Sequence, residues 1–454
     1  MRPISANELC KGLGIWEKDR LVTSVETDSR KVEENSLFVC IQGERTDGHR
    51  YAAQAMRQGA AGIIAQHPVE GVADEDVLLA ADPLDAMIAM GANYRARFSP
   101  VLVGVTGSVG KTTTKEFCYA VFSAFGSTVK TLGNQNNEIG MPNTLFRIDE
   151  TTEYAVIEMG MQGLGEIHKL TMAAQPQGAI ITMIGQSHLE QLGTRENILR
   201  AKMEICDGLC EGAPLVINAD NDLLVNAQVP PHVRRVTFAI ENQNADVRAE
   251  QIRKHNNGTR FALVDKEHGK FDVFIPAMGD HNVMDAISAY ALATRLGLDP
   301  IRAARALSNY ETTGQRQKLV VHHGISVLED CYNASPDSMR AGLQALHSME
   351  VAGRRIAVLG DMFELGAAAQ QAHRELADAC AKANVSLMIA VGEHMHQAVE
   401  RAAELGLATI YCDDNEQAAM TLWKEAKDGD GVLVKASHGM AFEQILERFY
   451  QMEK

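Results

Sequence analysis

The sequence contains a run of glycines and small residues that ends in a lysine and two threonines. Its residues are Thr106, Gly107, Ser108, Val109, Gly110, Lys111, Thr112 and Thr113. Small residues let successive backbone N–H groups close around phosphate oxygens, and a following helix adds the positive end of its dipole. Lys111 can offset charge on the β- and γ-phosphates, and the Thr112 hydroxyl can bind Mg²⁺. The run therefore predicts a site for ATP and Mg²⁺.

A glycine turn with an exposed lysine is the alternative interpretation of this run. The flanking sequence favours a phosphate-binding loop, because the apolar residues 101–105 predict a buried parallel strand and a helical pattern follows Lys111. The spacing departs from the usual Walker pattern, which would place a glycine at Val105. We therefore expect a variant loop, distinct from that of the common GTPase switches.

Two further residues are candidates for the metal site. Glu158 ends the predicted strand 155–157, and His188 follows the predicted strand 179–182. Ligands of open α/β sheets gather at the carboxyl ends of strands, and carboxylates suit Mg²⁺. Glu158 could instead be a capping or solvated glutamate, and a lone histidine is more often structural.

Other polar residues could contact an oxygen-rich ligand, although each also has an ordinary structural explanation. Lys202 would usually lie on a solvated helix face, and an asparagine-rich stretch could be a plain loop. Gly279 and His281 precede a helix and could form an N-cap turn instead of contacting a base. The candidates for ligand contacts are Asn134, Asn136, Asn137, His281, Asn282 and Asp330.

The pattern of apolar runs predicts an α/β protein of three domains. We expect a small N-terminal α/β domain at residues 1–83, a central ATP-binding domain at 84–312 and a Rossmann-like C-terminal domain at 313–454. The central sheet is expected to be mostly parallel, with helical crossovers. The alternating, turn-rich stretch 234–275, including Asn256-Asn257-Gly258, predicts antiparallel strands at one edge.

Composition and charge narrow the functional class. The formal net charge of −16 argues against a general nucleic-acid binder, so an anionic substrate must meet a local cationic site. The 8 cysteines lack the short paired spacings of a zinc or redox site and fit a reducing cytoplasm. We find neither an export signal nor an apolar stretch long enough for a membrane span. We therefore expect a cytoplasmic protein.

Taken together, the motifs resemble the Mur ligase family over essentially the whole chain. Those of the N-terminal domain are 27–30 (TDSR), 36–38 (SLF) and 47–49 (DGH), and those of the central domain are 134–140, 158–160, 165–167 and 201–205. The C-terminal segments 330–339 (DCYNASPDSM) and 359–366 (LGDMFELG) resemble the member that adds D-alanyl-D-alanine.

The resemblance implies a bacterial ligase that uses ATP to phosphorylate the carboxylate of UDP-N-acetylmuramoyl-tripeptide. The amine of D-alanyl-D-alanine then attacks the acyl phosphate, giving the pentapeptide, ADP and phosphate. Three hinged domains would close to exclude water from that intermediate. We expect a monomer with these two small-molecule substrates and with no nucleic-acid partner.

The resemblance also implies roles for individual residues. Lys111, Glu158, His188 and Lys202 would be catalytic, with Thr112, Glu158 and His188 at the metal and a carbamate on Lys202. Asn282 would contact adenine, Asp330 the ribose and Arg316 the γ-phosphate. The implied substrate-binding residues are Ser29, Arg30, Asp47, Gly48, His49, Asn134, Asn136, Asn137 and Asn333.

Two positions depart from the family pattern. Asp285 stands where the family usually has asparagine, and residues 435–439 (KASHG) resemble a KGSRG pattern with two changes. His438 carries a positive charge only near or below its pKa, so it is a weaker partner for a carboxylate than arginine.

Three other functions are alternatives to this ligase. The tripeptide-forming relative would carry an Asp-Asn-Pro-Arg signature, which is absent from this sequence, and folylpolyglutamate synthase lacks the N-terminal module. A nucleotide-regulated switch would hydrolyse ATP slowly and would not need either amide-forming substrate.

Overall fold

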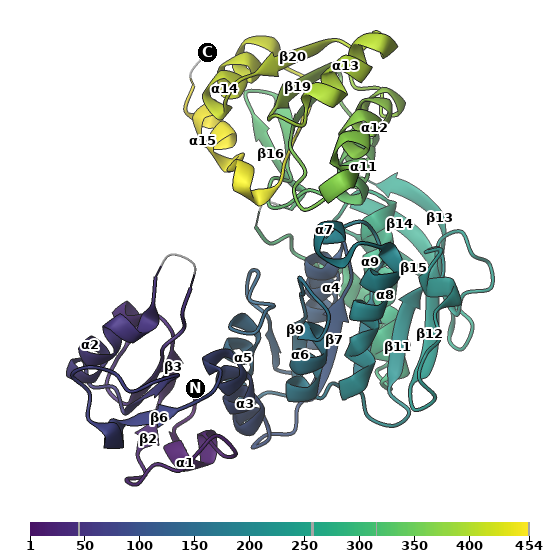
Figure 1. Ribbon diagram of the computed structural model, residues 1–454. Helices are drawn as coiled ribbons and strands as arrows, with labels where there is room; N and C mark the ends of the chain where they lie inside the picture. Colours follow the sequence, from purple (N-terminus) through teal and green to yellow (C-terminus); the bar gives the residue numbers. More distant parts are fainter. Residues whose placement is uncertain (44–45, 256–257, 315, 453–454) are drawn as a thin grey trace.

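The computed structural model describes residues 1–43, 46–255, 258–314 and 316–452. Three α/β domains follow one another along the chain (Figure 1). The three-domain α/β architecture predicted from the sequence is confirmed. In the described part of the chain no helix is long and apolar enough to cross a membrane.

The N-terminal domain is built on a parallel four-stranded sheet. Its strands, in spatial order, are β3 (Ser24–Glu26), β4 (Ser36–Val39), β5 (Gly62–Ala65) and β6 (Val77–Leu79). An antiparallel pair, β1 (Ile4–Ser5) and β2 (Leu21–Val22), lies beside it. The helical segments are α1 (Ala6–Leu9), η1 (Ser29–Lys31), η2 (Gly48–Tyr51), α2 (Ala52–Arg57) and η3 (Asp74–Asp76). The central strands β4 and β5 are buried throughout, as expected for continuous apolar runs.

Helix α3 (Pro83–Arg95) connects the first two domains. Asp82 caps it by accepting a hydrogen bond from the Leu84 amide at 2.8 Å, and Pro83 occupies its first turn. Met87 packs in the N-terminal core, whereas Ile88 packs against the central sheet. The helix therefore belongs to both cores, and the boundary predicted near residue 84 falls in its first turn.

The central domain contains a nine-stranded sheet. Its strands are β7 (Val101–Thr106), β8 (Thr128–Lys130), β9 (Tyr154–Glu158), β10 (Gly178–Ile181), β11 (Pro214–Asn218), β12 (Arg234–Ala239), β13 (Val247–His255), β14 (Gly258–Asp265) and β15 (Gly269–Ile275). Their spatial order is β15-β14-β13-β12-β11-β10-β7-β9-β8. The neighbours from β8 to β13 pair in parallel, and the hairpins β13–β14 and β14–β15 are antiparallel.

The prediction of antiparallel pairing throughout residues 234–275 is wrong for β12. This strand pairs in parallel with β11 and with β13, so only β13 to β15 form the antiparallel edge. An alternating pattern reports which face of a strand is buried and carries no information on strand direction. Asn256 and Asn257, part of the predicted turn, lie outside the described residues.

Helices cover both faces of the central sheet. One apolar core contains α4 (Lys111–Ser123), α9 (Asp280–Arg295) and α10 (Pro300–Ala306). The other contains parts of α3, α5 (Gly140–Leu145), α6 (Glu166–Ala174) and α8 (Arg195–Met203). The remaining helical segments are α7 (Leu189–Leu192), η4 (Glu204–Gly208), η5 (Leu224–Asn226) and η6 (Leu307–Asn309).

The C-terminal domain has a six-stranded sheet in the order β16-β17-β21-β18-β19-β20. The strands are β16 (Lys318–His322), β17 (Ile325–Glu329), β18 (Arg355–Gly360), β19 (Leu387–Val391), β20 (Thr409–Cys412) and β21 (Gly431–Lys435). Only the pairing of β16 is antiparallel. The helical segments are α11 (Pro336–Ser348), η7 (Gly366–Ala368), α12 (Ala369–Lys382), α13 (His396–Leu405), α14 (Asn415–Glu425), η8 (His438–Met440) and α15 (Glu443–Gln451).

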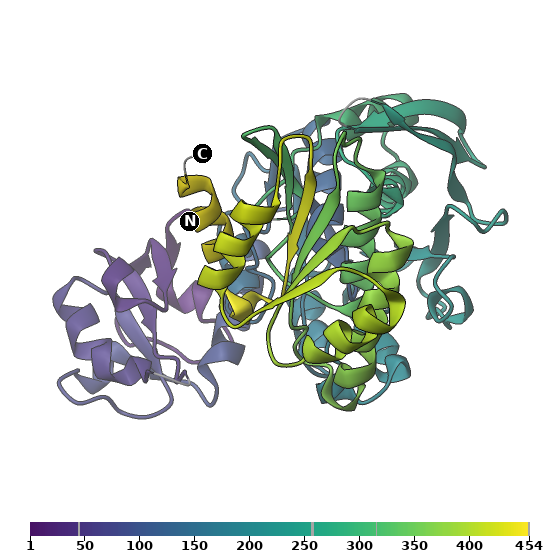
Figure 2. The ribbon, with the colours of Figure 1, turned by 90° about the horizontal axis from the view of Figure 1, so that it is seen from above.

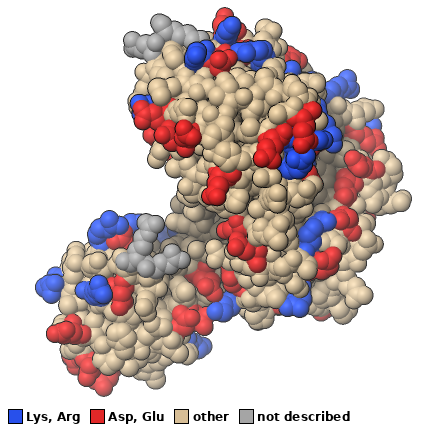
Figure 3. Space-filling view, turned by 45° about the horizontal axis from the view of Figure 1, so that its top comes forward, with Lys and Arg blue, Asp and Glu red and all other residues tan. Residues whose placement is uncertain are grey.

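The C-terminal domain lies over the carboxyl ends of the central strands (Figures 1 and 2). Polar contacts join the two domains beside α7. The Glu190 amide donates to the Glu364 carbonyl at 3.2 Å, and the Gln186 amide donates to Asp337 Oδ2 at 3.2 Å. The N-terminal domain projects to one side, and the surface is hollowed between it and the other two domains (Figure 3).

Candidate active site

The order of the central strands brings together residues that are far apart in the sequence. β7 lies between β10 and β9, and Val105 pairs with Glu158 while Thr106 pairs with Ile181. The glycine loop, Glu158 and Thr182 therefore meet at the carboxyl edge of the sheet. Ligands of parallel sheets bind at this edge, so the fold itself assembles the predicted site.

The glycines of the loop are required by its geometry. Gly107 has φ +146° and Gly110 has φ +87°, a region that side chains disfavour. A Cβ atom on Gly107 would lie 1.9 Å from Thr182 Oγ1, and one on Gly110 would lie 2.7 Å from Asp285 Oδ1. The loop backbone thus packs against Thr182 and Asp285 too closely for a side chain at either glycine, and α4 then begins at Lys111.

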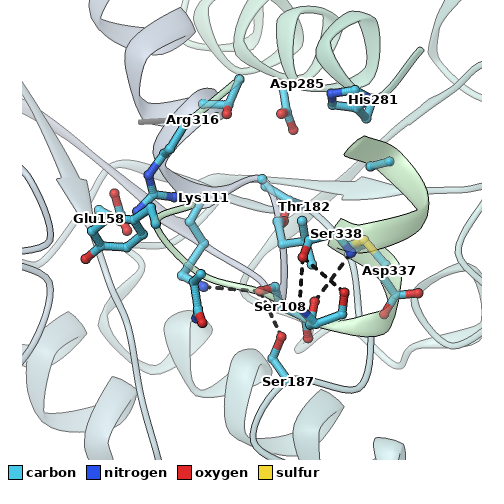
Figure 4. A pocket seen from close by; sticks show the side chains of 18 of the residues that line it. Ser108, Lys111, Glu158, Thr182, Ser187, His281, Asp285, Arg316, Asp337 and Ser338 are labelled. Atoms are coloured by element: carbon cyan, nitrogen blue, oxygen red, sulfur yellow. Dashed lines mark hydrogen bonds between the residues drawn. The ribbon is translucent and has the colours of Figure 1, made fainter. Parts of the chain in front are cut away.

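Lys111 lies in the wall of the cavity, at the start of α4. Its ammonium donates hydrogen bonds to the carbonyls of Gly107 at 2.8 Å and Ser108 at 3.4 Å. Loss of solvent lowers the pKa of Lys111, while Glu158 acts in the opposite direction. Figure 4 shows Lys111 near Glu158 and Arg316. An anionic ligand here would meet two cations.

Glu158 is a buried carboxylate with several partners. Thr112 Oγ1 donates to its Oε2 at 2.9 Å, and Asn136 Nδ2 donates to its Oε1 at 2.7 Å. Lys115 Nζ lies 3.5 Å from Oε2. Burial would raise the pKa of Glu158, but Lys115, Arg316 and Lys111 outweigh burial and keep it below its usual value. The carboxylate is therefore ionised, and its burial rules out a solvated glutamate.

His188 borders the cavity at the start of α7, where its backbone adopts φ +64°. Its Nδ1 lies 2.8 Å from Glu364 Oε2 of the C-terminal domain. The two groups are close enough to pair, although Nδ1 has no hydrogen bond of good geometry among the described residues. Carboxylates commonly lie beside metal-binding histidines. Among the described residues, no group of three or more His, Cys, Asp and Glu side chains is placed to hold a metal.

Lys202 is fully buried on α8, so the solvated helix face considered from the sequence is wrong. Its Nζ has no hydrogen-bond partner within the described part of the chain. Burial, followed by the nearby charge of Lys111, lowers the pKa of Lys202 well below its usual value. Both effects favour the neutral amine over the ammonium.

The opposite wall of the cavity comes from α9 and the segment that follows it. Asn282 Nδ2 donates to the Met278 carbonyl at 2.7 Å, and His281 Nε2 lies 2.7 Å from Gln317 Oε1. Burial lowers the pKa of His281. Asp285 also lines this wall (Figure 4).

The C-terminal domain contributes Asp330 and Arg316. Asp330 follows β17, and Lys435 at the end of the adjacent strand β21 places its Nζ 2.8 Å from Asp330 Oδ2. The same ammonium donates to the Asn333 carbonyl at 2.9 Å. The Arg316 guanidinium lies 4.0 Å from the ring centre of Tyr332, within range of a cation–π interaction.

These groups surround one cavity of about 880 Å³ between the central and C-terminal domains. Predicted site residues that line it are Ser108, Val109, Gly110, Lys111, Thr113, Asn134, Asn136, Asn137, Glu158, His188, Asn282, Arg316, Asp330 and Asn333. Thr106, Gly107, Thr112 and Lys202 are absent from its lining. Thr112 nevertheless bonds to a lining carboxylate, as described above.

The predicted substrate residues of the N-terminal domain are absent from the lining of this cavity. Ser29 is buried, whereas the Arg30 side chain is exposed and pairs with Asp28 at 2.8 Å. His49 Nδ1 lies 2.7 Å from Asp47 Oδ1. At Gly48 a Cβ atom would come within 2.8 Å of the Ile41 amide nitrogen. A ligand that contacts both these N-terminal residues and the cavity must therefore be long.

Sequence reasoning missed Lys115, Lys435 and Glu364 as parts of this site. Lys115 lies one helical turn after Lys111, a spacing that could have placed it near the same ligands. Lys435 and Glu364 lie in the segments 435–439 and 359–366 noted above, but no local pattern predicts their partners Asp330 and His188, which are distant in the sequence.

Three family models together match most of the chain. They are the Mur ligase family catalytic domain at residues 21–94, the Mur ligase middle domain at 105–293 and the Mur ligase glutamate ligase domain at 315–438. The chain belongs to the Mur ligase family. The family resemblance seen in the sequence motifs is thereby confirmed.

Relatives within the Mur ligase family share nearly the full length of the chain. The UDP-N-acetylmuramoyl-tripeptide–D-alanyl-D-alanine ligase of Bacillus subtilis is 36% identical, covering 94% of this chain and 93% of the relative. The ligase of the same name from Escherichia coli is 34% identical and covers 94% of both chains.

Solved Mur ligase structures share the fold. MurF from Acinetobacter baumannii superposes with a TM-score of 0.91 at 28% identity, covering 99% of both chains. MurF from Thermotoga maritima in complex with ADP gives a TM-score of 0.84 at 29% identity, covering 94% of this chain and 97% of that one.

Proposed function

We propose that this Mur ligase is an ATP-dependent ligase that adds D-alanyl-D-alanine to UDP-N-acetylmuramoyl-tripeptide in peptidoglycan precursor synthesis. The main observation behind the proposal is that the glycine loop, Glu158 and Arg316 line one cavity between two domains. Near-complete alignment with ligases of that activity supports it. We further propose that it acts as a monomer in the bacterial cytoplasm.

The first step of the proposed reaction joins two anions. A carboxylate oxygen of the tripeptide attacks the γ-phosphorus of ATP, the bond to the β-phosphate oxygen breaks, and ADP leaves. Lys111 and Arg316 would offset the negative charge that crowds the transferring group. Positive charge placed in a largely enclosed site is worth more than in water.

In the second step the amine of D-alanyl-D-alanine attacks the carbon of the acyl phosphate. The carbon–oxygen bond to phosphate breaks, the amine nitrogen loses a proton and an amide forms. Water would compete for the same carbon, so the site must exclude it. The C-terminal domain lies over the cavity and bonds to the loop after β10, which supports a role in that exclusion.

Thr112 and Glu158 would hold Mg²⁺. The donor set fits, since a hydroxyl and an ionised carboxylate are hard oxygen ligands and the phosphates supply others. The ion would offset charge on the β- and γ-phosphates. His188 would complete the metal site through Nε2, with Glu364 holding Nδ1.

Lys202 would carry a carbamate. The buried amine fits this modification, because burial favours its neutral form and its Nζ lacks a hydrogen-bond partner within the described residues. A carbamate would supply a negative charge near Lys111 and would help to orient the metal. Lys202 itself would then act through other groups and not on the substrate directly.

The other candidate residues would bind substrates. Asn282 would contact adenine, with His281 packed against the base, and Asp330 would accept a ribose hydroxyl while Lys435 holds its other oxygen. The UDP end would lie on the N-terminal domain, at Ser29, Arg30, Asp47, Gly48 and His49. The peptide end would reach Asn134, Asn136, Asn137 and Asn333 in the cavity.

Phosphate release from the purified protein tests this proposal. We expect release from ATP only when UDP-N-acetylmuramoyl-tripeptide and D-alanyl-D-alanine are both present, with omission of either one lowering the rate at least about tenfold. L-alanyl-L-alanine serves as the matched control for the second substrate. Release that ignores both substrates would instead identify a nucleotide-regulated switch.

A further inference from the structure

Asp285 is a carboxyl group in the wall of the nucleotide cavity, where α9 packs against the glycine loop and α4. It lies on α9 with 7% of its surface exposed. Thr114 Oγ1 donates to its Oδ1 at 2.8 Å. Its oxygen lies against Gly110, at 2.7 Å from the position of a Cβ atom there. Figure 4 shows the carboxyl group directed into the cavity.

This carboxyl group has no paired cation among the described residues. Across the described residues, no lysine, arginine or histidine forms an ion pair with Asp285. The titratable groups that face it are Cys118 on α4 and Tyr310 after η6. Burial raises the pKa of both, to about 12 for Tyr310, so both are neutral near pH 8. The cations Lys111 and Arg316 act on Glu158 instead.

Burial raises the pKa of Asp285 to about 8, with the hydrogen bond from Thr114 opposing the shift. A polyphosphate bound by the neighbouring loop would add negative charge and favour the protonated form further. A protonated carboxyl group has a hydroxyl donor, whereas an ionised one only accepts hydrogen bonds. Asparagine at this position would provide a donor at every pH.

We propose that Asp285 meets the nucleotide as a neutral carboxylic acid and donates a hydrogen bond to one of its oxygens, so that nucleotide binding is coupled to uptake of a proton. The inference rests on the proposed ATP site and deepens it. At pH values where the carboxyl group is ionised, binding must first protonate it, and the apparent affinity falls accordingly.

Calorimetric titration with ADP and Mg²⁺ between pH 7 and pH 9 tests the coupling. For the wild-type protein we expect an affinity about tenfold weaker at pH 9 than at pH 7, and uptake of about half a proton per ADP at pH 8. Buffers of different ionisation enthalpy measure the uptake. Asp285→Asn should remove the contribution of this carboxyl group to the pH dependence of the affinity and to the proton uptake.

Two further variants sharpen the test. Burial also lowers the pKa of Lys111, but Lys111 is present in both proteins, so the difference between wild type and Asp285→Asn isolates the carboxyl group. Asp272→Asn is the matched control, because Asp272 is an exposed aspartate of β15 that pairs with Arg260 and does not line the cavity, and this variant should behave as wild type. Thr114→Val removes a bond that favours the ionised form and should move the midpoint to higher pH.

The outcomes separate this proposal from the proposed function. Equal pH dependence and equal proton uptake in wild type and Asp285→Asn would overturn the coupling while leaving the nucleotide site in place. An unmoved midpoint in Thr114→Val would overturn it as well. Absence of ADP binding to the wild-type protein at any pH would contradict the nucleotide site itself.

Discussion

Lys111→Ala is expected to lower the rate of ligation by about a thousandfold, the upper range for removing one charge-stabilising group from an enclosed site. Lys111 begins α4 at the end of the glycine loop, where its ammonium is bonded only to loop carbonyls and is free to turn toward a phosphate. The loss should appear in kcat, because the transferring group carries more charge on its reacting oxygens than bound ATP does. Steady-state kinetics with both substrates measures the effect.

Lys270→Ala is the matched control for this substitution. Lys270 belongs to β15 at the far edge of the same sheet, is exposed and pairs with Glu250 at 3.6 Å. We expect its removal to leave the rate within about twofold, as for most exposed ion pairs. Near-wild-type turnover of Lys111→Ala would refute the assignment of the phosphate site.

Lys202→Met is expected to lower the rate by about a hundredfold, in line with other losses behind a metal site. Methionine keeps the volume of the side chain and cannot form a carbamate, so packing on α8 is preserved. The modification itself is measured directly: the wild-type protein in ¹³C-labelled bicarbonate should give one carbamate carbonyl signal by NMR, and Lys202→Met should lack it. Short carboxylates should restore part of the activity of Lys202→Ala.

Lys115 provides an internal comparison for the carbamate. It is buried as fully as Lys202, but its ammonium pairs with Glu116 at 3.3 Å and Glu158 at 3.5 Å. Because two carboxylates hold its ammonium, Lys115 should remain unmodified. A wild-type spectrum without a carbamate signal, together with unchanged activity of Lys202→Met, would reject the modification.

The sequence was sufficient to predict the elements that build the proposed phosphate site. Continuous apolar runs identified β7, β9 and β10, and the residue types after them predicted a loop and a carboxylate at one edge. Such runs are informative because a short, continuous apolar run fits a strand buried on both faces better than a helix, which is usually longer. Strand direction was less predictable, and β12 was placed in the wrong pairing.

The partners of buried charges were not predictable. Lys435 pairs with Asp330 from the adjacent strand β21, a contact set by the order of strands in the sheet. Glu364 reaches His188 because the C-terminal domain lies over the central one. Both depend on tertiary arrangement, which periodicity and local composition do not encode. The pKa of Asp285 is likewise a property of its burial and not of its neighbours in the sequence.

The fate of the oxygen atoms of the tripeptide carboxylate is the most direct test of the proposed ligation. If the reaction passes through an acyl phosphate, one carboxylate oxygen must leave with phosphate when the amide forms. With the tripeptide carboxylate labelled with ¹⁸O, we expect one labelled oxygen in each inorganic phosphate and one pentapeptide per ADP, both measured by mass spectrometry. Unlabelled phosphate released alongside the pentapeptide would contradict the account.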